Sequence, residues 1–275
     1  MDLGLDGRVA LVAGGSSGIG LAVALELARE GADVAIGARD PERLAAAERA
    51  TKEVARGRVH ATSVDVTDPV AARRWVDGVA ADFGALHVVL VNGGSPPVGP
   101  ASAFAVAEYR AAVDTVLLPA VGLALAALPH LEAAGWGRLL FLTSETAVVP
   151  VAPLTLSGVT RAGIVRFAQS LAAEVGRDGI TVNVLAPGHT RTPPIERMAA
   201  RLAGDGDVEA RLQAMGHHCA LGRLARPEEV AAVAAFLASE RASFVTGTVQ
   251  LIDGGAAVVP PPLPHLTALG KDALT

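Results

Sequence analysis

The sequence is poor in cysteine, in aromatic residues and in excess charge of either sign. Cys219 is the only cysteine among 275 residues, so no intramolecular disulfide can form, and a reducing compartment is indicated. The net charge of −5 provides no basic surface for nucleic acid or for an anionic membrane. The N-terminus carries acidic residues ahead of a short apolar run, unlike a signal peptide. These absences indicate a cytoplasmic protein that binds neither nucleic acid nor membranes.

Apolar runs long enough to span a bilayer are not expected either. The longest run, residues 115–128, is short for a membrane span and contains Pro119. The sequence therefore predicts a buried, kinked helix at this place.

Short β-branched and apolar runs alternate along the chain with longer, helix-like segments. Apolar residues make up 51% of the sequence and aromatic residues only 3%, which suits a sheet covered by helices. Strands are expected at residues 8–13, 33–38, 58–64, 87–91, 138–143, 180–185 and 248–252. Helices are expected at residues 18–30, 41–56, 69–83 and 162–176, among others. The alternation predicts an α/β fold with a doubly wound, seven-stranded parallel sheet flanked by helices.

The domain organisation follows from the same pattern. No linker interrupts it, so residues 1–255 are expected to form one domain. Residues 187–225 form an insertion before the last strand and are predicted to be helical in part. Residues 256–275 are rich in proline and are predicted to be a C-terminal tail.

A glycine-rich segment, "AGGSSGIG", follows the first expected strand. Glycine lets the backbone turn tightly and approach a pyrophosphate, and the next helix offers free N–H groups at its N-terminus. An ordinary βα turn could also be rich in glycine, but the strand–loop–helix context favours a dinucleotide site. The residues assigned to this phosphate loop are Gly14, Ser16, Ser17, Gly18, Ile19 and Gly20.

The end of the second expected strand indicates which dinucleotide is bound. An NAD-binding protein places an acidic residue there against the ribose 2′-hydroxyl, whereas this chain has Ala38 followed by Arg39. An arginine can pair with a 2′-phosphate, so NADP(H) is favoured over NAD(H). The alternative is a solvated arginine at the start of a helix.

With these residues in place, the chain resembles the short-chain dehydrogenase/reductase family over nearly its whole length. The resemblance rests on "GGSSGIG" (14–20), "DVTD" (65–68), "VNGGSPPVGP" (91–100), "ITVNVLAPGHTRT" (180–192) and the segment 221–255. It implies a single-domain Rossmann fold and further cofactor contacts. Asp65 and Val66 would meet the adenine, and Asn92 and Gly93 the adenosine ribose. Towards the nicotinamide the resemblance assigns Pro187, Gly188, Thr190 and Thr192. Asp65 and Thr192 could instead cap a turn or a helix.

The catalytic positions of that family are only partly kept. Ser144 matches the serine that polarises the substrate oxygen. Thirteen residues later Ser157 stands where the family has its proton-donating tyrosine, and Arg161 stands where it has lysine. Val116 occupies the place of the asparagine that holds a water relay. One of four expected groups is therefore retained.

These replacements change the chemistry that the site can perform. A phenol titrates near pH ~10, but a serine hydroxyl is a far weaker acid and cannot replace it as a proton donor. Arg161 stays cationic and could still bind ribose hydroxyls, a carbonyl oxygen or an anionic group. General acid catalysis contributes about 10²–10⁴-fold, so hydride transfer could persist without it.

Few residues remain as alternative proton sources. Tyr109, the only tyrosine, is expected far from the nicotinamide, whereas His189 directly follows "PG" and Glu145 adjoins Ser144. His189 is taken as a catalytic candidate with Ser144, Ser157 and Arg161, although a surface histidine is an alternative. The resemblance implies that the insertion 187–225, which contains His217 and His218, covers the substrate. The two histidines lack a clear third ligand, so no metal is expected.

Three functions are compatible with the sequence. The first is an NADP(H)-dependent oxidoreductase that acts on a small or medium carbonyl or alcohol compound. The others are a non-redox catalyst (cyclase, dehydratase or isomerase) and a nucleotide-binding protein without catalysis. Helices 105–134 and 153–177 are apolar around much of their circumference, so a homodimer or homotetramer through them is expected.

Overall fold

The computed structural model describes residues 2–259 of the chain. Of the expected tail 256–275, the structure describes only the start, with a short 3₁₀ turn at Ala256–Val258. Residues 260–275 lie outside the described part.

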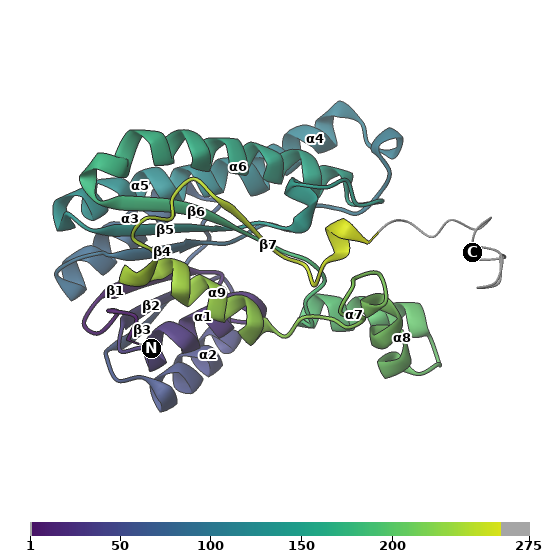
Figure 1. The fold of residues 1–275 in the computed structure, drawn as a ribbon, viewed down its shortest axis with the longest axis horizontal. Helices are drawn as coiled ribbons and strands as arrows, with labels where there is room; N and C mark the ends of the chain where they lie inside the picture. Colours follow the sequence, from purple (N-terminus) through teal and green to yellow (C-terminus); the bar gives the residue numbers. More distant parts are fainter. Residues whose placement is uncertain (1, 260–275) are drawn as a thin grey trace, which may run out of the picture.

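Seven parallel strands form one sheet, as the sequence predicts (Figure 1). Their order is β3-β2-β1-β4-β5-β6-β7. The strands are β1 (Val9–Ala13), β2 (Asp33–Ala38), β3 (Val59–Ser63), β4 (Val88–Val91), β5 (Gly137–Leu142), β6 (Ile180–Pro187) and β7 (Val249–Ile252). The order reverses between β1 and β4, and ligands of open α/β sheets bind at the carboxyl ends of the strands beside such a reversal.

Helices cover both faces of the sheet (Figure 1). One layer consists of α1 (Gly18–Arg29), α2 (Pro41–Val54) and α9 (Pro227–Ala238). The opposite layer consists of α3 (Pro69–Phe83), α5 (Leu118–Ala134) and α6 (Thr155–Val175). Alternate residues of β1 face the two layers: Leu11 packs with the α3, α5 and α6 side, and Ala10 and Val12 pack with the other. Burial on both faces explains why the strands are apolar throughout.

One helical stretch, Val106–Ala134, extends beyond the apolar run 115–128 at both ends. It joins α4 (Val106–Ala112), a π-helical turn η2 (Val113–Leu117) and α5, with the expected irregularity just ahead of Pro119. Its mean hydropathy of 2.0 and its 29 residues would suffice for a bilayer span by length and composition alone. However, Leu123, Ala127 and Leu131 are fully buried in the core, so this stretch is a core helix of the domain.

Helix α6 begins at Thr155, within the expected helix 153–177 and ahead of residue 162, where its clearest helical pattern starts. Residues 155–161 include Gly158 and the β-branched Val159, whose helix propensity is weak. Burial of Leu156, Ser157 and Thr160 against the domain overrides that propensity. The two residues that replace the family's tyrosine and lysine therefore share the first two turns of one helix.

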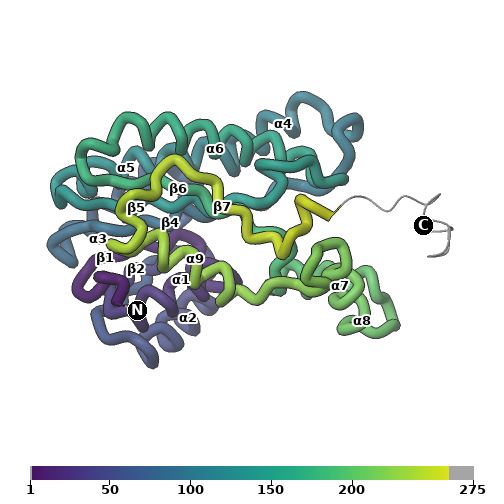
Figure 2. Tube along the Cα trace, in the orientation of Figure 1, coloured from purple at the N-terminus to yellow at the C-terminus, as the bar shows by residue number. Residues whose placement is uncertain are grey.

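The insertion 187–225 is partly helical, as predicted, and contains α7 (Pro193–Ala203) and α8 (Val208–Gly216). Figure 2 shows the chain leaving the sheet after β6, passing through both helices and returning to α9. A bridge between Thr190 and Ala225 joins the two ends of the insertion at its base. Arg223 there bonds to Glu229 at 2.7 Å and lowers the pKa of that carboxyl to about 2.

Candidate cofactor and active site

The phosphate loop lies between the end of β1 and the start of α1. Gly14 adopts a φ of +62°, and a side chain there would also meet the Asn92 amide nitrogen at 2.6 Å. A Cβ on Gly20 would collide with the backbone carbonyl of Gly14. The Asn92 amide donates a hydrogen bond to that carbonyl at 3.4 Å and fixes the turn. The loop therefore keeps its shape only with glycine at positions 14 and 20.

A cavity of about 470 Å³ opens beside this loop, at the carboxyl ends of β1, β2 and β4. It brings together eight of the predicted cofactor residues: Gly14, Ser16, Ser17, Arg39, Asp65, Val66, Asn92 and Gly93. Gly18, Ile19 and Gly20 instead form the first turn of α1, under the loop. The cavity is thus built from segments that the sequence places far apart.

Charged groups at the rim of this cavity are arranged around Arg39. The Arg39 side chain is 75% exposed and lies 3.9 Å from Asp65, too far for a hydrogen bond. Asp65 is held by the neighbouring Thr67, whose backbone N–H and hydroxyl donate to its Oδ1 and lower the pKa of Asp65. Asp40 caps α2 and is paired with Arg43. Within the described residues, Arg39 is therefore the cation at this rim that has no short ion pair.

The residues expected near the nicotinamide lie on the far side of the phosphate loop. A Cβ on Gly18 would lie 3.2 Å from the Thr192 methyl carbon, so Thr192 adjoins the loop. Thr192 precedes α7 without a side-chain capping bond, which leaves its hydroxyl available to a ligand. The Thr190 hydroxyl instead donates to the carbonyl of Gly188, and Pro187 ends β6.

Ser157 and Arg161 form one hydrogen-bonded unit on α6. Arg161 donates from Nη1 to the Ser157 hydroxyl at 2.7 Å and from Nη2 to the Gly94 carbonyl at 3.1 Å. The buried Ser157 hydroxyl also contacts the Thr146 hydroxyl at 2.9 Å. Ser144 is nearby in sequence, and its Oγ accepts only a long bond from the Thr146 N–H at 3.3 Å. The Ser157 hydroxyl is therefore used internally, and the Ser144 hydroxyl is the freer of the two.

Arg161 is a cation in a place that favours neutral groups. Burial lowers its pKa, although a guanidinium remains charged at pH 7. No carboxylate of residues 2–259 forms an ion pair with it. Its partner Gly94 lines the cofactor cavity. A charge in this position favours an oxygen-rich or anionic ligand.

Val116 and Tyr109 are not placed to move protons in this site. Val116 is buried in the π-helical turn and packs against Gly94. A Cβ added to Gly94 would lie 2.8 Å from a methyl carbon of Val116. Tyr109 lies on α4, and its hydroxyl donates to the Ala101 carbonyl at 3.2 Å.

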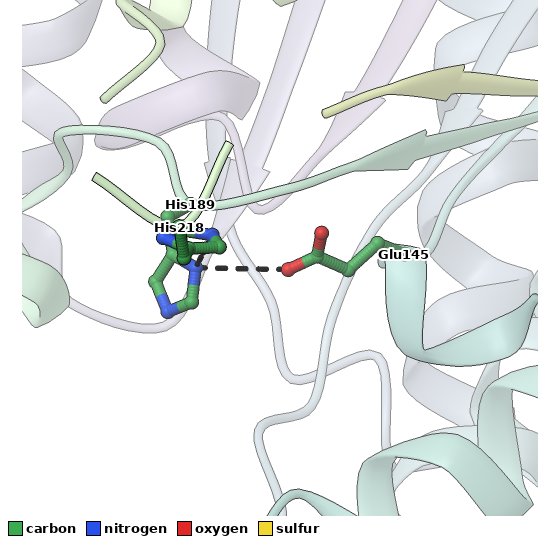
Figure 3. A group of neighbouring side chains, drawn as sticks. All are labelled: Glu145, His189 and His218. Carbon is green, nitrogen blue, oxygen red and sulfur yellow. Dashed lines mark hydrogen bonds and ion pairs between the residues drawn. The ribbon is translucent and has the colours of Figure 1, made fainter. Parts of the chain in front are cut away.

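Glu145, His189 and His218 converge from three segments (Figure 3). The Nδ1 atom of His189 lies 2.8 Å from His218 Nε2 and 3.6 Å from a carboxylate oxygen of Glu145. Burial raises the pKa of Glu145, and burial with the neighbouring His218 lowers the pKa of His189 to about 4. His189 is therefore neutral at pH 7 and is a poor proton donor.

Several residues of the site were missed by the sequence analysis. The cavity is also lined by Asp40, Arg43, Thr67, Gly94, Ser95 and Thr115. Thr67 stands inside the quoted "DVTD" motif, so its side chain was available as a signal. Thr146 carries no such signal, because only the folded chain brings it to Ser157.

The fold and the glycine loop define a protein of the Rossmann class. Residues 13–257 match the family model described as enoyl-(acyl carrier protein) reductase. The chain is 38% identical over 258 residues to the cis-4-hydroxycyclohexanecarboxylate dehydrogenase of Sinomonas cyclohexanicum, covering 92% of this chain and 97% of that protein. It is 34% identical to the 4-formylbenzenesulfonate dehydrogenase of Comamonas testosteroni, covering 92% and 99%.

Solved structures are similar to this chain as well. The L-sorbose reductase of Gluconobacter frateurii, complexed with NADPH and L-sorbose, superposes with a TM-score of 0.90 at 35% identity and covers 94% of this chain and 100% of that chain. The chain therefore belongs to the short-chain dehydrogenase/reductase family and is an oxidoreductase of that family.

Proposed function

We propose that this protein is an NADP(H)-dependent oxidoreductase for a small or medium carbonyl or alcohol substrate, working with a degenerate catalytic tetrad. The observation that carries the proposal is the cavity beside the phosphate loop, with the exposed Arg39 at its rim, paired only with Asp65 and only at 3.9 Å. The relatives named as dehydrogenases and reductases favour this over a non-redox catalyst or a binding protein.

The residues around the cavity fit a dinucleotide phosphate. The glycine loop and the start of α1 would hold the pyrophosphate, and Arg39 would pair with the 2′-phosphate. Thr192 would bond the carboxamide of the nicotinamide. When bound, this cofactor supplies or accepts the hydride.

The chain's own residues would then orient and polarise the substrate. Ser144 would donate a hydrogen bond to the substrate oxygen. Arg161 would bind ribose hydroxyls or an anionic group of the substrate, and Ser157 would hold the guanidinium in position. This division of labour retains binding and polarisation without the tyrosine.

A cyclic hydroxy acid is the first substrate to assay, because one relative is named for cis-4-hydroxycyclohexanecarboxylate. Nicotinamide reduction with NADP⁺, followed at the absorbance of the reduced ring, would support the redox proposal. A product formed with no change in the nicotinamide would instead indicate the non-redox alternative.

Replacing Arg39 with alanine is expected to weaken NADPH binding by about 10–100-fold, because a charge-assisted hydrogen bond is worth about 1.5–3 kcal/mol. NADH binding should change little, since NADH has no 2′-phosphate. Fluorescence titration of both nucleotides measures this. Arg49→Ala, at an exposed arginine further along α2, is the matched control. Equal losses for NADH and NADPH would contradict the proposed role of Arg39.

We also propose that the protein is a homodimer or homotetramer through α5 and α6. Leu118 on α5 and Val159 on α6 are 53% and 52% exposed, as apolar residues of an interface would be in a single chain.

Light scattering at micromolar concentration should give a dimer or a tetramer. Leu118→Glu should shift the protein toward the monomer, because it would bury a charge in the interface. Leu202→Glu, at an exposed apolar residue of α7 in the insertion, should leave the assembly unchanged. A monomeric wild-type protein would refute this proposal.

A further inference from the structure

The cluster of Glu145, His189 and His218 brings together three segments that lie far apart in the sequence. Glu145 follows β5, His189 follows β6, and His218 comes from the end of the insertion, just after α8 (Figure 3). Strands β5 and β6 are parallel neighbours, so Glu145 and His189 meet at the same edge of the sheet. In the sequence alone, His217 and His218 lack a third ligand, and no metal is expected. The fold places a carboxylate and a second imidazole, those of Glu145 and His189, beside His218.

The distances within the cluster suit a metal ion. One ligand atom from each residue lies within 4.8 Å of the other two. Ligands at ~2.1 Å around a tetrahedral zinc ion stand about 3.4 Å apart. The observed separations from His189 Nδ1, 2.8 Å to His218 and 3.6 Å to Glu145, fall on either side of that value. Small side-chain rotations would therefore complete the geometry.

The hydrogen bond from Nδ1 of His218 orients its other ring nitrogen, Nε2, toward the cluster. Its Nδ1 contacts the carbonyl oxygen of Met215 at 2.5 Å, so Nδ1 must carry the proton. Nε2 then carries the lone pair and accepts the hydrogen bond from His189 Nδ1, and a metal ion between the two nitrogens would take the place of that shared proton. A metal-bound histidine is typically oriented in this way by a carbonyl on its other nitrogen.

The charge around the cluster also favours a cation. The Glu145 side chain is only 5% exposed, and its one ion-pair partner within residues 2–259 is His189. The carboxylate of Asp253 adds negative potential near Glu145. Asp253 itself is held by the backbone N–H groups of Gly255 and Ala257. A divalent ion would neutralise this buried negative charge.

We propose that Glu145, His189 and His218 form a binding site for one divalent first-row transition metal ion, such as Zn²⁺. Two imidazoles and a carboxylate suit zinc or ferrous iron, whereas Mg²⁺ prefers oxygen ligands. Both histidines line a cavity of about 150 Å³, which has room for the water that a site with three protein ligands retains. The ion would fasten the insertion to the edge of the sheet.

The test is a calorimetric titration of Zn²⁺ into untagged, chelator-treated full-length protein without nucleotide. Wild-type protein should bind one ion per chain. Glu145→Gln, His189→Ala and His218→Ala should each weaken binding by more than the ~10–100-fold that loss of an outer-shell partner costs. His217→Ala is the matched control, because the adjacent histidine stands outside the cluster, and its affinity should be that of the wild type.

Two further measurements make the result specific. Co²⁺ should give the visible absorption of a four- or five-coordinate ion in the wild type and in His217→Ala, but not in His189→Ala. A Zn²⁺-induced rise in melting temperature should follow the same pattern. Mg²⁺ should not displace Zn²⁺, and Fe²⁺ added without oxygen tests the alternative metal of this class.

The proposal is overturned if wild-type protein shows no saturable binding, or if His218→Ala binds as tightly as His217→Ala. Circular dichroism of each variant separates lost binding from lost folding. The titration uses no nucleotide, so a failure of NADPH binding leaves it valid, and an absent metal leaves the proposed reductase function standing.

Discussion

Replacing Arg161 with alanine is expected to weaken NADPH binding by about 10–100-fold and to lower kcat/KM further, without lowering the melting temperature. In the bound state the guanidinium would donate to ribose hydroxyls, and hydrogen bonds to charged groups are worth about 1.5–3 kcal/mol each. The two bonds that it donates within the protein, to Ser157 and to Gly94, offset the cost of burying its charge. Its charge has no carboxylate partner among the described residues, so its removal relieves a desolvation cost. Nucleotide titration, steady-state kinetics and a melting curve measure the three effects.

Two companion variants sharpen this experiment. Arg161→Lys should recover only part of the binding, because an ammonium group cannot bond to two acceptors in the planar geometry of a guanidinium. Arg166→Ala, at an exposed arginine of the same helix that bonds to Gln169, should behave as the wild type. If Arg161→Ala bound NADPH normally and melted earlier, Arg161 would be a structural residue and not a ligand-binding one.

Replacing Gly20 with alanine is expected to abolish measurable nucleotide binding and to lower stability. The new Cβ would collide with the Gly14 carbonyl and approach the Asn92 amide nitrogen at 3.0 Å, so the loop would have to open. Overpacking of this kind costs about 1–3 kcal/mol, and at about 2–4 °C per kcal/mol the melting temperature should fall by several degrees. Circular dichroism and NADPH titration on the same sample measure both effects.

Gly78 provides the matched control for this substitution. It lies within α3, with open space where a Cβ would stand. Gly78→Ala should leave nucleotide binding unchanged and should stabilise the protein by about 0.5–1 kcal/mol, because alanine is the better helix former. If Gly20→Ala retained wild-type affinity, the loop would not be the pyrophosphate site.

The sheet was predictable because its strands are buried on both faces. Such strands are short apolar runs, and the seven expected runs agree with β1 to β7 to within about two residues at each end. The start of α6 was expected at both 153 and 162, because residues 155–161 have weak helix propensity and their burial decides that they are helical.

The candidate site was predictable only where a local motif carries it. The glycine loop and Arg39 lie next to strands whose ends can be read from the sequence, and the structure groups them around one cavity. The contacts of Ser157 with Thr146, and of Glu145 with two histidines, depend on the packing of segments distant in the chain. No spacing rule connects such residues before the chain is folded.

The bridge between Thr190 and Ala225 has a consequence for how this enzyme could acquire new substrates. Both ends of the insertion leave the domain at this bridge. Its two helices could therefore be replaced as a unit without moving the flanking segments. Residues 193–216, from the start of α7 to the end of α8, could diverge, shorten or be grafted from a relative while the sheet, the phosphate loop and Thr192 keep their own contacts. Selectivity for substrate and affinity for cofactor can thus evolve on separate parts of the same chain.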